Sequence, residues 1–218
     1  MADKLTPLQR RTLTLLAGIE PRWTLTGGGA LAAVHLGHRP TRDLDLFWHG
    51  LHRFDREEEE VVQRLREAGL SVTTLRTAAS YRQLRVASGA ETVVVDLVAD
   101  PVATIEPPML TNIDGATIQI DTPHEILVNK LCALLGRTEL RDLVDVRALL
   151  DTGGEFLRGL SDAPRKDGGF SPLTLAWLMQ GFDVLTLCAQ EGWSEAEAAS
   201  LDGFRRELVT RLTEAGRP

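Results

Sequence analysis

The first half of the chain alternates helical and strand-like patterns of apolar residues. Leucines at helical spacing predict a helix over 6–19, and the segment 55–70, with acids in its first turn and a glycine at its end, is typical of a second helix. Alternating or β-branched residues predict strands at 71–77, 81–88 and 91–100. With two shorter runs, one ending at Thr26 and one around Asp43, they predict a mixed sheet of about five strands.

The second half of the chain is helical in pattern almost throughout. A small hairpin around the Asp-Gly pair 114–115 comes first, and the Thr-Pro-His-Glu run 122–125 is typical of a helix start. Helical patterns then cover 122–136, 139–151, about 154–162, 171–190 and 194–214. The sequence therefore predicts an α+β protein with a mixed α/β domain at 1–121 and a helical region at 122–218.

Composition bears on the cellular location of the protein and on the state of its two cysteines. Hydrophobic residues make up 43% and charged residues 25% of the 218 positions, and no window of about 18 uncharged apolar residues occurs. The N-terminal run MADKLTPLQRR lacks the apolar core of a signal peptide, so we expect a cytoplasmic protein with no membrane partner. Cys132 and Cys188 lie on separate apolar helical stretches, which favours two buried thiols over a disulfide or a metal pair.

The formal net charge of −7 argues against a broad nucleic-acid-binding surface, because such surfaces are usually basic. A local basic rim around an acidic metal centre is compatible with this charge. The candidates for such a rim are Arg76, Arg82, Arg85, Arg137, Arg141 and Arg147.

The segment 25–47 carries the clearest chemistry. Three consecutive glycines at 27–29 allow a tight turn and a close backbone approach, and the short helix expected after them directs its free N–H groups towards an anion. Asp43 and Asp45 follow on a strand with one residue between them. Because side chains alternate along a strand, both carboxylates face the same way, an arrangement that suits Mg²⁺.

Asp96 is a third candidate carboxylate, in the middle of the apolar run VVVDLV. A charge within an apolar strand costs several kcal/mol unless it is paired or bound to a metal. Two interpretations stay open: a metal ligand that completes the acidic site, or a salt bridge to one of the strand arginines.

A second group of charges lies in the helical half. Lys130 follows apolar residues on its helix, so its ammonium group either reaches the surface along the helix or is held towards a nucleotide. In the next helix Asp142 and Asp145 lie on one face, and Arg141 is spaced to pair with Asp145. A surface charge network and a functional cluster both fit this spacing.

Together, Gly27-Gly28, Thr41, Asp43-Leu44-Asp45 and the apolar-flanked Asp96 resemble the nucleotidyltransferase superfamily typified by the polymerase β core. More narrowly, GGGALAAVHLGHRPTRDLDLF together with EILVNKLCALLGRTELRDLVDVRALL resembles the AbiEii/AbiGii toxin-type nucleotidyltransferases of bacterial toxin–antitoxin systems. The resemblance covers about residues 20–170, and its second motif is the more specific. It implies the nucleotidyltransferase fold, with a mixed sheet flanked by helices, in which 1–121 is the catalytic core and the helical region 122–218 completes the active site.

Position by position, the resemblance makes Gly27 and Gly28 the phosphate turn, Lys130 the lysine that meets the triphosphate and Asp145 the acid that closes the site. Gly29 departs from the family, which usually has serine or threonine there. We assign nucleotide binding to Gly27, Gly28, Gly29, Thr41, Arg42 and Lys130. We assign metal binding to Asp43, Asp45 and Asp96, and catalysis to these three with Lys130 and Asp145.

The resemblance implies an enzyme that uses Mg²⁺, with two metal ions in its site, to move a nucleoside monophosphate from an NTP such as ATP to a hydroxyl acceptor. It implies the 3′ end of a tRNA as acceptor and an antitoxin as partner. One alternative is a small hydroxylated acceptor, such as an aminoglycoside, or a protein side chain. A non-catalytic binding module of the same fold is another, although mutually repelling carboxylates argue against it.

Overall fold

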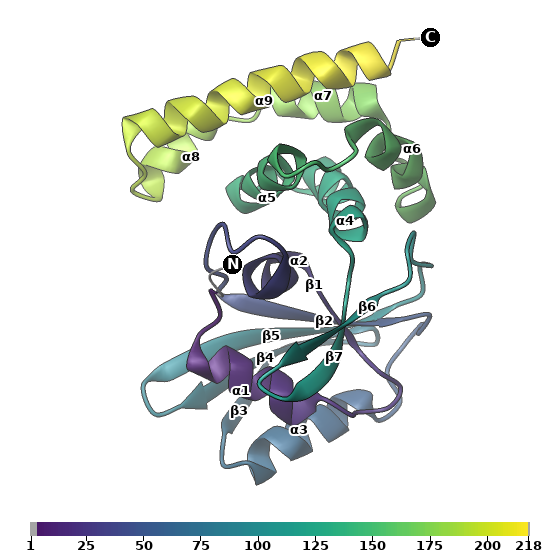
Figure 1. Ribbon diagram of the computed structural model, residues 1–218, viewed down its shortest axis with the longest axis vertical. Coiled ribbons are helices and arrows are strands. Elements are labelled where there is room, and N and C mark those ends of the chain that lie inside the picture. The colour runs from purple at the N-terminus through teal and green to yellow at the C-terminus, as the bar shows by residue number, and fades with distance from the viewer. Residues whose placement is uncertain (1–3, 218) are drawn as a thin grey trace. The chain divides into compact units, whose positions relative to one another are not determined.

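A mixed seven-stranded sheet forms the first half of the protein (Figure 1). The structure, a computed structural model, describes residues 4–217 and divides into two units, the first ending at Pro123 and the second beginning at His124. The strand order is β3-β4-β5-β2-β1-β7-β6. The strands are β1 (Thr24–Thr26), β2 (Asp43–His49), β3 (Ser71–Ala78), β4 (Tyr81–Ser88), β5 (Glu91–Asp100), β6 (Met109–Ile113) and β7 (Ala116–Ile120).

The α+β prediction is confirmed, but the expected count of about five strands is wrong. The β6–β7 hairpin forms as predicted, with Asp114 and Gly115 at φ values of 49° and 89° that suit a tight turn. It also joins the sheet, because β7 pairs in parallel with β1 and places Ile120 opposite Leu25. That pairing joins segments almost a hundred residues apart, so local sequence patterns do not reveal it.

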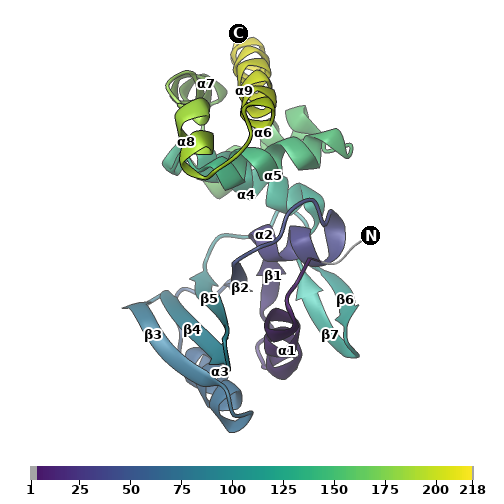
Figure 2. The same ribbon diagram turned by 90° about the vertical axis from the view of Figure 1, so that its left-hand side faces the viewer.

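Alternation along β2 separates a core face of the sheet from a polar face. Leu44, Leu46 and Trp48 are buried, whereas the residues between them are only half-buried. The core face packs towards α3 (Glu57–Glu67), which Figure 2 shows beside β3 and β4. Helix α1 (Pro7–Leu16) packs against α3 and β5. The polar face is the one that carries the acidic residues.

A helical turn begins directly at the end of β1. The first residues form α2 (Gly27–Ala30), which continues as a π-helical turn, η1 (Leu31–His35). The three glycines therefore build the first turn of a helix, and this turn contacts both β1 and β2.

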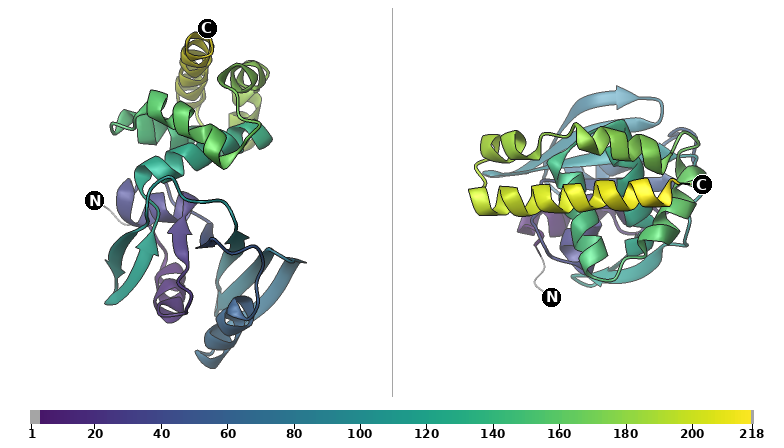
Figure 3. Two further views of the ribbon diagram at one scale, coloured as in Figure 1. Left: turned by 90° about the vertical axis from the view of Figure 1, so that its right-hand side faces the viewer. Right: turned by 90° about the horizontal axis from the view of Figure 1, so that it is seen from above.

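The second unit is helical, as predicted. Its helices are α4 (Pro123–Gly136), α5 (Leu140–Asp151), α6 (Phe156–Lys166), α7 (Pro172–Gln180), α8 (Val184–Gln190) and α9 (Glu195–Ala215). The region expected as one helix over 171–190 is two, because Gly181 caps the end of α7 and Asp183 caps the start of α8. The long α9 runs beside α7 (Figures 1 and 3). No single helix within residues 4–217 is long and apolar enough to cross a bilayer.

Candidate active site

The glycine turn lies against the Asp45 carboxylate. Gly27 has a φ of +59°, and a Cβ at this position would lie 2.5 Å from Oδ2 of Asp45. A Cβ on Gly28 would lie 3.1 Å from the Thr41 hydroxyl and 3.1 Å from a guanidinium nitrogen of Arg39. The absence of side chains at Gly27 and Gly28 thus leaves room for the Asp45 carboxylate, the Thr41 hydroxyl and the Arg39 guanidinium to approach the turn.

Gly29 has a packing role in addition to its predicted nucleotide role. A Cβ on Gly29 would lie 3.1 Å from the Leu25 side chain and 3.4 Å from that of Leu44. Any side chain there would meet the apolar core. This close packing gives a physical reason for the glycine at this position.

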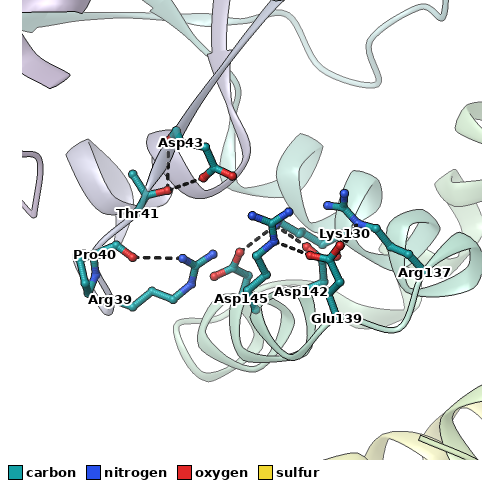
Figure 4. Close-up of polar contacts among 10 residues, drawn as sticks. Arg39, Pro40, Thr41, Asp43, Lys130, Arg137, Glu139, Asp142 and Asp145 are labelled. Atoms are coloured by element: carbon teal, nitrogen blue, oxygen red, sulfur yellow. Dashed lines mark hydrogen bonds and ion pairs between the residues drawn. The ribbon is translucent and has the colours of Figure 1, made fainter. Parts of the chain in front are cut away.

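Asp43 is positioned by hydrogen bonds that extend back to the first helix. The Thr41 hydroxyl donates to Oδ1 of Asp43 at 2.9 Å and also lies 3.1 Å from the Asp43 carbonyl oxygen (Figure 4). The Thr41 carbonyl in turn accepts from the Gln9 side-chain amide at 2.9 Å. Gln9 is 2% exposed and closes a capping box with Thr6 at the start of α1. Arg42, the predicted nucleotide ligand between Thr41 and Asp43, is exposed.

Asp45 and Asp96 are direct neighbours across the parallel strands β2 and β5. The side chain of Asp96 lies on the half-buried face of β5, whereas the residues on either side of it are buried on the opposite face. Its Oδ1 accepts from the Tyr81 hydroxyl at 2.6 Å and from the Gln83 amide at 2.9 Å. Burial and the hydrogen bond to Asp96 raise the pKa of Tyr81, so its phenol stays protonated and donates. The sequence predicted a metal or an arginine as the group facing Asp96, and missed both of these neutral donors.

The carboxylates suit a magnesium ion that is shared with a substrate. Within residues 4–217, no three His, Cys, Asp or Glu side chains converge closely enough to hold a metal ion alone. Mg²⁺ is commonly bound by one or two carboxylates together with substrate phosphates and water, rather than by a complete protein cage. Asp43 and Asp45 supply two such carboxylates on one face, next to the glycine turn that would receive the phosphates.

The second predicted group of charges is a buried cluster in the second unit. Nζ of Lys130 lies 2.6 Å from Oδ1 of Asp142 and 2.8 Å from Oδ2 of Asp145 (Figure 4). Arg137 contacts the other oxygen of Asp142 at 3.0 Å. Both aspartates are fully buried and Lys130 is 7% exposed, so neither a surface-reaching lysine nor a surface network describes this cluster. Arg141, expected to pair with Asp145, has its Nε 2.6 Å from Glu139.

Asp142 and Asp145 keep the side chain of Lys130 positively charged. Burial alone would lower the pKa of Lys130, but the nearby charges of Asp145 and Asp142 and their hydrogen bonds raise it. The ammonium group therefore stays charged at neutral pH. Two of its three N–H donors face carboxylates, which fixes its orientation and leaves one donor for another acceptor.

A half-buried histidine between two carboxylates was not predicted from the sequence. His49 has Nδ1 3.3 Å from Asp100 and Nε2 3.3 Å from the fully buried Asp121. Burial alone would lower the pKa of His49, but the two carboxylates raise it to about 9. The register of β2 and β5 places His49 beside Asp100, whereas its approach to Asp121 depends on the unpredicted β1–β7 pairing.

The predicted site residues therefore fall into two groups, one in each unit. The glycine turn, Thr41, Asp43, Asp45 and Asp96 are gathered at one end and one face of the sheet. Lys130 and Asp145 are brought together by α4 and α5. Gln9, Tyr81 and Gln83 were missed, although the capping box of α1 and the alternation of β4 were both readable signals.

Two solved structures share this fold at low sequence identity. MenT4, a nucleotidyltransferase toxin from Mycobacterium tuberculosis, is 19% identical with a TM-score of 0.61, over 94% of this chain and 82% of that one. JHP933 from Helicobacter pylori is 19% identical with a TM-score of 0.52, over 94% of this chain and 90% of that one. No curated protein sequence matches significantly.

The family assignment comes from the sequence itself. The family described as "Nucleotidyl transferase AbiEii toxin, Type IV TA system" matches residues 12–200, most of both units. The chain therefore belongs to the AbiEii family and is a nucleotidyltransferase toxin of a toxin–antitoxin system.

Proposed function

We propose that this toxin transfers a nucleoside monophosphate from an NTP to the 3′ end of a tRNA in a Mg²⁺-dependent reaction that releases pyrophosphate. The observation that carries this proposal is the position of the Asp43–Asp45 pair against the Gly27 turn. Nucleotidyl transfer needs an anion-binding turn and adjacent carboxylates, because phosphate and metal charges must be balanced at one point.

The phosphate side of the reaction is assigned to the turn and the segment before β2. Backbone N–H groups at Gly27, Gly28 and Gly29 would face the triphosphate, with the Thr41 hydroxyl and Arg42 beside it. Arg39 joins this set, because its guanidinium lies over Gly28. A guanidinium matches the geometry of phosphate oxygens and balances the charge that develops on the departing pyrophosphate.

The acidic side is assigned to three carboxylates. Asp43 and Asp45 would hold the magnesium ions, with Asp96 as a further ligand. When bound, Mg²⁺ neutralises phosphate charge and favours ionisation of the attacking hydroxyl. Tyr81 and Gln83 occupy Oδ1 of Asp96, which leaves Oδ2 to accept the proton of the acceptor hydroxyl.

The second unit supplies Lys130 and Asp145. We assign the remaining N–H donor of Lys130 to the triphosphate, with Asp142 and Asp145 fixing its direction. Asp145 is thus a positioning residue for the lysine. The family implies an NTP substrate and a cognate antitoxin; the choice of ATP, the tRNA acceptor and a cytoplasmic location are proposals that fit such a toxin.

The proposal is tested with purified protein and four separately labelled NTPs. Each NTP is incubated with total tRNA, with an aminoglycoside mixture, or with the protein alone, in Mg²⁺ and in excess EDTA. We expect label on tRNA from one preferred NTP, in Mg²⁺ only, and susceptibility of that label to removal by a 3′ exonuclease. Label confined to the aminoglycosides or to protein would overturn the tRNA assignment, and label in EDTA would overturn the metal assignment.

A further inference from the structure

A line of neighbouring side chains runs from the acidic site to the edge of the sheet. Asp45 on β2 is in register with Asp96 on β5, Asp96 with Gln83 on β4, and Gln83 with Arg76 on β3. Residues in register on adjacent strands project from the same face of a sheet. The polar face therefore changes from acidic at its centre to basic at its outer strand.

A second arginine projects from the same face. Arg85 is two residues from Gln83 on β4, so it shares the side of the sheet with Gln83 and Arg76. Both arginines are exposed. Diagonal neighbours on adjacent strands lie about 7–8 Å apart, so the two guanidinium groups can act on one ligand. Figure 2 shows β3, β4 and β5 side by side in this part of the sheet.

Arg82 lies on the opposite face, although it is on the same strand. It is in phase with the core residue Leu84, and its guanidinium pairs with Glu58 of α3 at 2.6 Å. Within residues 4–217, neither Arg76 nor Arg85 forms such an ion pair with an acidic side chain. Of the three strand arginines considered for a basic rim, Arg76 and Arg85 therefore lie on the face of the sheet that carries the acidic site. Arg82 lies on the opposite face, in its ion pair with Glu58.

We propose that Arg76 and Arg85 bind phosphates of the single-stranded end of the acceptor nucleic acid and lead its 3′ hydroxyl to Asp96. This inference rests on the function proposed above. Guanidinium groups recognise phosphates with two parallel hydrogen bonds. Tyr81 projects from the same face, two residues from Gln83 on β4; its hydroxyl is fixed to Asp96 and its ring offers a stacking surface for a base.

The charge of the chain limits this contact to a few nucleotides. With a net charge of −7, a long duplex would be repelled by most of the surface. Two arginines beside an aromatic ring fit a short single strand, because each guanidinium neutralises one phosphate. A single-stranded RNA terminus is therefore favoured over an extended helix.

The test measures binding, independently of transfer. A fluorescein-labelled single-stranded RNA of twelve nucleotides ending in CCA is titrated with full-length protein by anisotropy at several KCl concentrations. The variants are Arg76→Ala/Arg85→Ala and, as a control with equal charge change, Arg66→Ala/Arg82→Ala on the α3 side. NTP affinity is measured for each by calorimetry with a non-hydrolysable analogue.

We expect the site-face variant to bind RNA at least tenfold more weakly, with the slope of log K against log salt lowered by about 1.4 for two lost phosphate contacts. The control variant should keep the wild-type slope, and NTP affinity should be unchanged in both. If the double variant does not fold, Arg76→Gln and Arg85→Gln carry the test, each lowering the slope by about 0.7. Equal losses in both double variants, or no loss in the first, would overturn the inference.

The outcome of the RNA-binding experiment can be distinguished from the outcome of the label-transfer experiment. If the arginines govern RNA binding while tRNA receives no label, the transfer proposal fails and the binding face stands. If tRNA is labelled while Arg76→Ala/Arg85→Ala binds RNA like the wild type, the acceptor approaches from elsewhere and the binding face is wrong.

Discussion

The side-chain amide of Gln9 donates a hydrogen bond to the backbone carbonyl of Thr41 at 2.9 Å, and so ties the first helix to the entrance of the acidic strand. The Thr41 hydroxyl in turn donates a hydrogen bond to the Asp43 carboxylate. A residue 34 positions away in the sequence thereby fixes the carboxylate assigned to the metal. Gln9 is buried and acts on Asp43 through Thr41, which makes it a positioning residue.

Replacing Gln9 should weaken metal use more than nucleotide binding. Gln9→Met keeps the volume of the side chain but leaves the Thr41 carbonyl without this donor, at a cost of about 1–3 kcal/mol in stability. We expect kcat to fall and the Mg²⁺ concentration for half-maximal activity to rise at least threefold, with little change in KM for the NTP. Gln63→Met, at an exposed amide on α3, is the control. An unchanged Mg²⁺ requirement in Gln9→Met would remove the positioning role.

Gly27→Ala should reduce transfer through a local clash. The new Cβ would lie 2.5 Å from Oδ2 of Asp45 and displace that carboxylate, in addition to the strain of a positive φ. Gly89→Ala is a matched control, because Gly89 has a φ of +58° and no atom within 4 Å of its added Cβ. We expect similar thermal destabilisation in both variants and at least a tenfold loss of transfer in Gly27→Ala alone. Comparable transfer rates in Gly27→Ala and Gly89→Ala would mean that the reaction does not require the observed position of the Asp45 carboxylate.

Lys130→Met should destabilise the protein markedly. It leaves the fully buried Asp142 and Asp145 without the ammonium that both contact, and breaking a buried ion pair typically costs about 3–5 kcal/mol. Urea unfolding measures this loss, with Lys4→Met at an exposed position as control. A loss below about 1 kcal/mol would show that the cluster is not electrostatically essential. Because of this expected loss, activities of Lys130 and Asp145 variants need to be measured on protein shown to be folded.

His49 should give stability a dependence on alkaline pH. Its pKa of about 9 in the folded protein is above the ordinary histidine value of 6.5, so folding favours the protonated ring. That contribution is complete below about pH 6.5 and is lost as the pH rises through 9. The melting-temperature difference between wild type and His49→Gln should therefore be larger at pH 6.5 than at pH 10. A difference that does not change with pH would contradict a charged His49.

Much of the fold and of the acidic site was predictable because its signals are local. Strand alternation placed Asp43 and Asp45 on one face, and helix-start residues located α4. The attachment of β7 to β1 and the approach of His49 to Asp121 depend on pairings between distant segments. The donors on Asp96 come from the neighbouring strand β4, whose alternation was readable in the sequence. Burial of Asp142 and Asp145 was also beyond the sequence, since charged residues three apart on a helix are usually solvated.

If Asp43 and Asp45 support metal-dependent nucleotidyl transfer, their charges are required for the initial rate of label transfer to tRNA, which is measured for Asp43→Asn and Asp45→Asn. Asparagine keeps the size of the side chain and removes the charge, and Asp114→Asn in the β6–β7 turn is the control. We predict a loss of at least about a hundredfold in both site variants, equivalent to about 2.7 kcal/mol, with unchanged melting and a fully active control. Transfer by folded Asp43→Asn at the wild-type rate would contradict a metal-binding role of these carboxylates.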